Sequence, residues 1–155
     1  MSRDERAATV TRRSRLGCTS SAPSRARAFV ADAGQSWGLS EEAIEAAQLA
    51  TSELVSNSVE HALSAVEITL ELEDEYLRIA VRDYSTALPV RRSPGPGGAR
   101  GRGIALVVAL AQDWGVELHE DGKTVWLLLP ATPEGVGPSV LERPQVVEVS
   151  EHFTE

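Results

Sequence analysis

The chain has 155 residues, 42% of them hydrophobic and 25% charged, which is enough for the core of one globular domain and leaves little room for a second. The formal net charge of −8 argues against a general binder of nucleic acid or anionic membranes, because either partner requires a cationic surface. Cys18 is the single cysteine, which excludes an internal disulfide, and no apolar run resembles a signal peptide or a membrane span, so we expect a cytoplasmic protein.

The two ends of the chain differ from its middle. The N-terminal end is rich in Arg, whereas Pro and Glu accumulate at the C-terminal end and hydrophobic periodicity fades there. We expect a flexible, solvated arm at residues 1–7, a folded domain at residues 8–131 and a mobile tail at residues 132–155.

The first predicted elements are a strand and a helix. The β-branched residues within Thr9–Leu16 favour an edge strand. Ser21 and Pro23 indicate a helix start, with the serine as N-cap and the proline in the first turn. The helix should run to Trp37, and Gly38 should end it.

A long second helix carries the most informative polar pattern. Ser40 is its predicted cap, and apolar positions recur every three or four residues up to about Ala62, as a buried stripe requires. Glu53, Asn57 and His61 are spaced four apart and form one ridge beside that stripe. An amide oxygen suits Mg²⁺ that carries phosphate oxygens, and a carboxylate one turn away can accept a proton from an attacking hydroxyl. The same spacing also fits three side chains on an ordinary exposed helix face.

Two alternating strands and a long loop follow. Val66–Leu72 and Tyr76–Val81 each place apolar residues on one face and mainly charged residues on the other. Asp83 closes the second strand, where it could accept a hydrogen bond from an exocyclic amine such as that of adenine, or simply begin a turn. Residues 84–102 are rich in Pro and Gly, and loops of this length are typically lids or disordered.

The domain should close with a helix and a hairpin. Gly103–Trp114 predicts an apolar helix, and the strands Val116–Glu120 and Lys123–Leu129 are joined by the turn signal Asp121-Gly122. The complete set of elements predicts an α+β fold, a two-layer sandwich in which helices cover one face of a mixed, mostly antiparallel sheet.

The glycine-rich end of the long loop runs directly into the third predicted helix. Free backbone N–H groups at that helix start, together with Arg100 and Arg102, make a site suited to phosphates. A dinucleotide fingerprint fails because Leu106 stands where its third glycine is needed, and the P-loop signature is absent. A flexible linker is the main alternative, and the acidic context opposes an RNA-binding Gly/Arg tract.

Taken together, these segments resemble the GHKL superfamily, the ATP-binding domain shared by gyrase, histidine kinases, mismatch-repair proteins and a heat-shock chaperone. Its anti-sigma-factor serine kinase branch is the most similar. ELVSNSVEHA at residues 53–62 is similar to the family's N box, and GRGIALV at residues 101–107 is similar to its second glycine box. The resemblance covers roughly residues 8–131 and implies the histidine-kinase-like ATPase fold.

The resemblance also implies roles for individual residues. Glu53 would be the general base, Asn57 the Mg²⁺ ligand, Asp83 the adenine-binding carboxylate, and Thr124 a support of the contact between adenine and aspartate. The residues expected to contact ATP are Asn57, His61, Asp83, Arg100, Gly101, Arg102, Gly103 and Thr124. The usual Asp-x-Gly-x-Gly becomes DYSTA at residues 83–87, and its side chains limit how closely the backbone can approach a nucleotide.

The implied function is that of an ATP- and Mg²⁺-dependent protein serine kinase. Such a protein sequesters a sigma factor or phosphorylates an anti-anti-sigma (STAS) protein, and the likeness suggests a homodimer without direct contact to nucleic acid. One alternative is a non-catalytic module in which nucleotide gates a protein partner, which the missing glycines favour. Another is an interaction protein with a decayed nucleotide site, which the intact Glu53 and Asn57 oppose. A stand-alone sensor histidine kinase is disfavoured because we expect no preceding dimerisation helix with a phosphoacceptor histidine.

Overall fold

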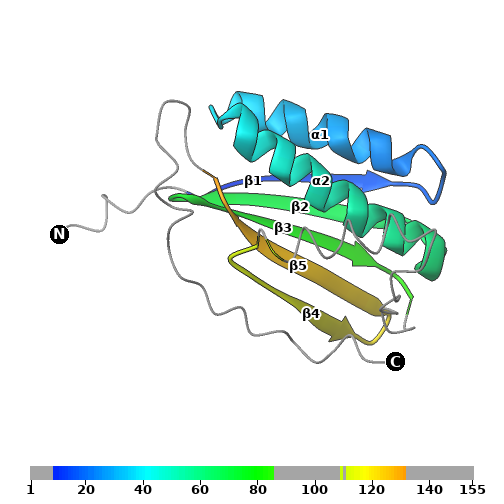
Figure 1. Cartoon of the computed structure of the whole chain (residues 1–155). Coiled ribbons are helices and arrows are strands. Elements are labelled where there is room, and N and C mark those ends of the chain that lie inside the picture. Colours follow the sequence, from blue (N-terminus) through cyan, green and yellow to red (C-terminus); the bar gives the residue numbers. More distant parts are fainter. Residues whose placement is uncertain (1–8, 86–108, 110, 132–155) are drawn as a thin grey trace.

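The computed structural model describes residues 9–85, 109 and 111–131, which form a five-stranded sheet with two helices packed on one face (Figure 1). The strand order is β1-β2-β3-β5-β4, and every pairing among the described residues is antiparallel. The predicted α+β sandwich is confirmed, and the described sheet contains no parallel pair. The elements are β1 (Val10–Leu16), α1 (Ala22–Ser36), α2 (Glu41–Asn57), η2 (Ser58–Ala62), β2 (Val66–Glu73), β3 (Tyr76–Asp83), β4 (Asp113–His119) and β5 (Gly122–Pro130).

The strand β1 lies at one edge of the sheet and leads into α1, as expected. The helix ends at Ser36, and Gly38 follows with a φ of 71°, a conformation that stops a helix. Ser21 occupies the N-cap position, but its side chain makes no capping hydrogen bond, which corrects the predicted capping role. Its own backbone is already helical, at φ −85° and ψ −7°, whereas a capping serine needs an extended backbone.

The second helix begins with a true cap. The Ser40 backbone is extended, with ψ at 158°, and its hydroxyl accepts a hydrogen bond from the backbone N–H of Ala43 at 3.1 Å. The predicted length, to Ala62, is confirmed, but the last part is the π-helical turn η2. This turn is wider than an α-helical one, so it rotates His61 away from the position that regular α-helical spacing predicts. Leu63, with a φ of 53°, ends the helix in the left-handed region.

The predicted helix at Gly103–Trp114 extends too far. Most of it lies outside the described residues, but Asp113 and Trp114 belong to strand β4. Pairing with β5 begins even earlier, because the Gln112 N–H donates to the Leu128 carbonyl at 2.7 Å. The apolar character of Trp114 fits a buried helix as well as a buried strand, so the sequence pattern alone does not distinguish them; in β4 its side chain faces the core.

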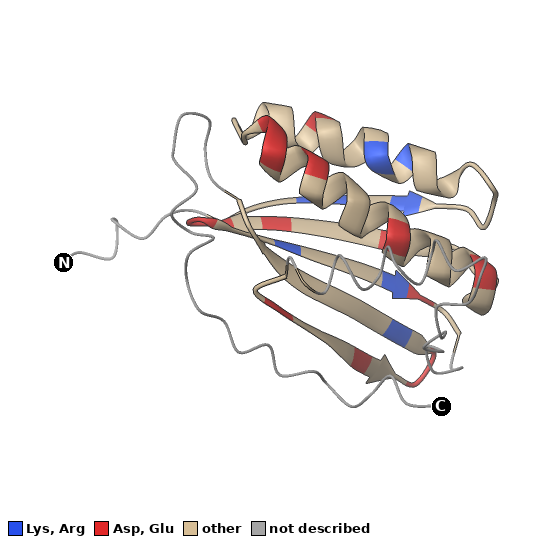
Figure 2. Cartoon of the chain, viewed as in Figure 1, with Lys and Arg blue, Asp and Glu red and all other residues tan. Residues whose placement is uncertain are grey.

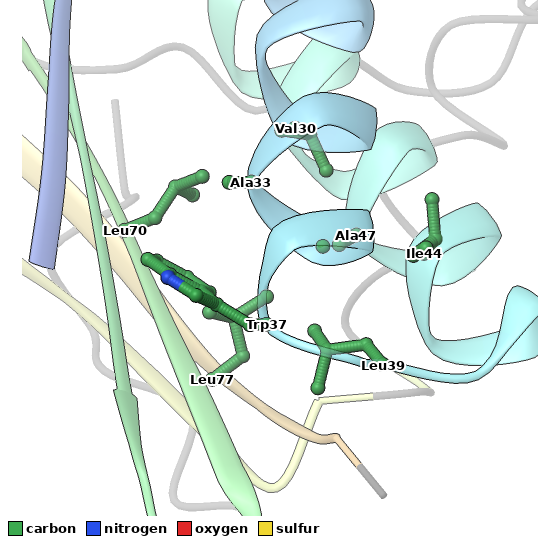
Figure 3. Close-up of a pocket in the computed structure, with 9 residues that line it drawn as sticks. Val30, Ala33, Trp37, Leu39, Ile44, Ala47, Leu70 and Leu77 are labelled. Carbon is green, nitrogen blue, oxygen red and sulfur yellow. The ribbon is translucent and has the colours of Figure 1, made fainter. Parts of the chain in front are cut away.

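Alternating residues of the sheet face the two helices and form the core. The helices approach each other closely at Gly34, where an added Cβ would lie 2.6 Å from Ile44. Figure 3 shows the apolar side chains that fill the space between this helix pair and the strands, including Trp37, Leu70 and Leu77. This region leaves no room for a water molecule, so it is packed core and not a ligand cavity.

The opposite face of the sheet carries both signs of charge, which are interspersed on the strands in Figure 2. Arg78 of β3 lies 3.5 Å from Glu71 of β2 and 3.7 Å from Glu117 of β4, and its guanidinium stacks over Trp126 at 5.4 Å.

In the described part of the chain, no helix has the length and apolar character needed to cross a membrane.

Candidate functional site

The end of β3, the start of β5 and the π-helical turn η2 meet around Asp83. This carboxylate is completely buried on the helix-facing side of the sheet. Its Oδ2 atom lies 2.8 Å from the Nζ atom of Lys123 and accepts a hydrogen bond from the Ser58 hydroxyl at 3.4 Å. Its Oδ1 atom accepts the backbone N–H of Ser85 at 3.0 Å. The carboxylate thus has partners on the helix (Ser58), on the neighbouring strand (Lys123) and two residues further along the chain (Ser85). Together these contacts fix its position.

The register between β3 and β5 brings Lys123 to Asp83. These two residues are directly opposite each other, so their side chains lie on the same face of the sheet. Gly122, one residue earlier, makes the close approach possible, since a Cβ atom there would lie 2.0 Å from the Asp83 carbonyl oxygen. The hairpin turn therefore places a charged amine directly against the buried carboxylate.

Glu53 and Asn57 lie one turn apart near the end of α2, as the sequence predicted. Both are half-buried, and the Oε2 atom of Glu53 is not accessible to solvent. Leu54 and Val55, between them, pack into the core and hold this part of the helix on the sheet. Ser58 follows Asn57 directly and contacts Asp83, so this end of α2 lies beside the buried carboxylate.

His61 and Thr124 are placed differently from the other predicted residues. His61 is half-buried on the π-helical turn, beyond the α-helical part of the ridge. Thr124 is opposite Arg82 and lies on the charged face of the sheet, whereas Asp83 faces the helices. Its hydroxyl lies 2.8 Å from the Nε2 atom of His119. The structure thus brings Lys123 to Asp83 and does not bring the Thr124 side chain there.

Lys123 and Ser58 are the site residues that the sequence analysis missed. A signal for Lys123 exists in the alternation of β5, where it shares the inward register with Val125 and Leu127. A lysine at an inward position needs a buried partner. Ser58 also carried a signal, because its spacing from Leu54 and Val55 puts a polar residue on the buried stripe of the helix. Its partner depends on how the π-helical turn packs on β3.

The chain is anchored by several contacts directly after β3. The backbone N–H of Tyr84 donates to the Ser64 hydroxyl at 3.1 Å. Two guanidinium groups lie over the Tyr84 ring, that of Arg15 at 5.5 Å and that of Arg82 at 4.8 Å from the ring centre. The predicted phosphate-binding residues of the loop lie outside the described residues; they are Arg100, Gly101, Arg102 and Gly103.

Comparison with known protein families identifies the domain to which these elements belong. The profile of the histidine kinase-like ATPase domain matches residues 19–129, which include both helices, the ridge on α2 and the Asp83 cluster. The chain therefore belongs to the histidine kinase-like ATPase domain family, the class of kinase-like ATPase domains that the GHKL resemblance implied.

A solved structure shares the fold. The chain is similar to the RsbU and RsbW domains of Rv1364c from Mycobacterium tuberculosis, with a TM-score of 0.61 and 22% sequence identity. The match covers 80% of this chain and 32% of the other, so the chain spans about a third of that protein's length. None of the curated proteins matches the chain in sequence.

Proposed function

We propose that the chain is an ATP- and Mg²⁺-dependent protein serine kinase that sequesters a sigma factor or phosphorylates an anti-anti-sigma (STAS) protein. The observation that carries the proposal is the position of Glu53 and Asn57. They lie one turn apart on α2, and the residue after Asn57 contacts the buried Asp83. Glu53 as the candidate general base, Asn57 as the candidate metal ligand and Asp83 as the candidate adenine-binding carboxylate therefore belong to one packed unit.

Asn57 is suited to Mg²⁺ in the presence of a nucleotide. The described residues hold no group of three or more His, Cys, Asp or Glu that could bind a metal on their own. Mg²⁺ keeps several waters and is bound by few protein ligands together with phosphate oxygens, so a single amide oxygen such as that of Asn57 can contribute to its coordination. Bound Mg²⁺ supplies charge neutralisation at the phosphates, and the amide oxygen of Asn57 would orient it.

Glu53 is suited to the role of general base. Its carboxylate is partly withdrawn from water and sits one turn before Asn57, so it can accept the proton of an acceptor serine hydroxyl. Asp83 would accept a hydrogen bond from the exocyclic amine of adenine. Arg100, Arg102 and the backbone around Gly101 and Gly103 would contact the phosphates, and His61 would lie at the same end of the helix.

A phosphotransfer assay tests the proposal. The full chain is incubated with ATP labelled at the γ-phosphate and with each purified STAS-domain protein of the source organism. We expect labelling of one STAS protein on serine, and its loss in both Glu53→Ala and Glu53→Gln. The Glu60→Gln variant is the control, because it removes a carboxylate from the same helix end and should keep the activity. Absence of transfer to every STAS protein would contradict the kinase assignment.

A second candidate function is that of a nucleotide-gated protein-binding module without phosphotransfer. The DYSTA segment favours it, since the glycines usual after this aspartate are replaced by residues with side chains. The same assay separates the two functions. A module would bind ATP and change its affinity for a sigma factor without labelling any protein.

A further inference from the structure

We propose that Lys123 determines the base specificity of the nucleotide site, by donating a hydrogen bond to a ring nitrogen of the base whose amine binds Asp83. This inference deepens the proposed function and rests on it. Its starting point is the buried pair of Lys123 and Asp83, in which the two side chains are 7% and 1% exposed.

Stability alone does not explain a buried pair at this position. The other inward positions shared by β3 and β5 are apolar, such as Val81 opposite Val125 and Ile79 opposite Leu127. Apolar residues of similar size in place of a buried ion pair are often neutral or stabilising, because burying two charges is costly. A charged pair at the strand ends, beside the end of α2, therefore points to a ligand.

The pair has hydrogen-bonding capacity left over. An ammonium group has three N–H donors, and within the described residues the Lys123 ammonium contacts only the Asp83 carboxylate. Asp83 Oδ2 has two partners, Lys123 and Ser58, whereas Oδ1 accepts one backbone N–H and can take a second donor. A polar group that enters the cluster would therefore find both an available donor, on Lys123, and an available acceptor, Asp83 Oδ1.

Adenine has a complementary edge. It presents an amino group next to an unprotonated ring nitrogen, N1, which together form a donor beside an acceptor. If the amine donates to Asp83 Oδ1, the ammonium of Lys123 lies on the neighbouring side and can donate to N1. Hypoxanthine presents an oxygen and a protonated N1 in these two places, so it would put an acceptor against the carboxylate and a donor against the ammonium. A site that forms hydrogen bonds to a polar group of its ligand discriminates strongly against an analogue whose group at that position does not match.

The test compares ATP with 1-deaza-ATP, in which a C–H replaces N1, and with inosine triphosphate. We expect the wild-type chain, in the presence of Mg²⁺, to bind 1-deaza-ATP at least about tenfold more weakly than ATP, as the loss of a charged hydrogen bond implies. Inosine triphosphate should bind more weakly still. This comparison needs no variant, so it does not depend on how substitutions affect folding.

Two variants complete the test. In Lys123→Met the difference between ATP and 1-deaza-ATP should disappear, whereas Arg82→Met, which changes the neighbouring basic residue on the other sheet face, should keep it. Equal binding of ATP and 1-deaza-ATP by the wild type would overturn the role of Lys123 and leave the proposed function standing. Tighter ATP binding by Lys123→Met would also overturn it, because the lysine would then block the site. No binding of ATP at all would overturn both.

Discussion

The Ser58 hydroxyl lies 3.4 Å from the Asp83 carboxylate, and this contact joins the π-helical end of α2 to the end of β3. Both residues are buried. Since Ser58 follows Asn57 in the chain, the candidate metal ligand and the candidate base-binding carboxylate are held by the same packing of helix on sheet. The positions of Asn57 and Asp83 relative to each other are thus fixed by the packing of the fold, and such preorganisation favours binding of any ligand that contacts both residues.

The buried pair of Asp83 and Lys123 gives the first prediction. Asp83→Asn should destabilise the protein by about 3–5 kcal/mol, because it leaves the lysine ammonium buried without a counter-charge. Glu71→Gln is the control, since it removes one partner of a partly exposed ion pair and should cost less than ~1 kcal/mol. Urea denaturation measures both. If the two variants lose a similar free energy of unfolding, the buried pair contributes no more to stability than a partly exposed ion pair does.

The close approach of Gly122 to the Asp83 carbonyl gives the second prediction. In Gly122→Ala the new methyl group would lie 2.0 Å from a backbone oxygen, so the strands must move apart. We expect the free energy of unfolding to fall by about 1–3 kcal/mol, as at other overpacked sites, and nucleotide binding to weaken. Gly17→Ala is the matched control, because its nearest contact would be 4.0 Å away. Thermal unfolding followed by circular dichroism distinguishes the two, and equal midpoints would contradict the close approach.

The two helix starts offer a matched comparison of serine residues. Ser40→Ala removes a side-chain cap from α2 and should cost about 1 kcal/mol. Ser21→Ala removes a hydroxyl that caps nothing, so it should change the free energy of unfolding by less than about 0.5 kcal/mol. Denaturant titration of both variants checks this difference. A larger effect at Ser21 would mean that its side chain caps α1 in solution.

Leu63 gives a prediction of increased stability. It is 74% exposed and has a φ of 53°, where a side chain costs energy and glycine does not. Leu63→Gly should raise the free energy of unfolding by about 0.5–1 kcal/mol, whereas Leu63→Ala keeps the Cβ atom and should not. Calorimetric melting of the two variants tests this. Destabilisation by glycine would indicate that the leucine side chain makes a stabilising contact in solution.

Much of the fold could be predicted from local patterns. Alternation in β2 and β3 and the cap at Ser40 each follow from a few neighbouring residues, and the structure confirms them. The predicted hairpin is present, but its turn residues are Glu120 and Asp121, because Gly122 pairs with His119 as the first residue of β5. The predicted start of β4 was wrong, because an apolar residue such as Trp114 fits the core from a helix or from a strand. Only the pairing with β5 decides between the two.

The site was less predictable than the fold, because its contacts join distant parts of the chain. The spacing of Glu53 and Asn57 is local, so the sequence placed them correctly on one helix. The partner of Asp83 depends on the register between β3 and β5, in which a shift of one residue exchanges Lys123 for Thr124. The π-helical turn that carries Ser58 and His61 has no signal in the hydrophobic pattern.

The central claim is that this chain binds Mg²⁺-ATP at the end of α2 through Asn57. Isothermal titration calorimetry of the full chain with ATP, with and without Mg²⁺, tests it most directly, on the wild type, Asn57→Ala and the neighbouring control Ser56→Ala. We predict binding that requires Mg²⁺, survives in Ser56→Ala and weakens at least about tenfold in Asn57→Ala, as the loss of a metal ligand implies. Absence of binding at millimolar ATP, or equal affinity of Asn57→Ala and the wild type, would contradict the claim.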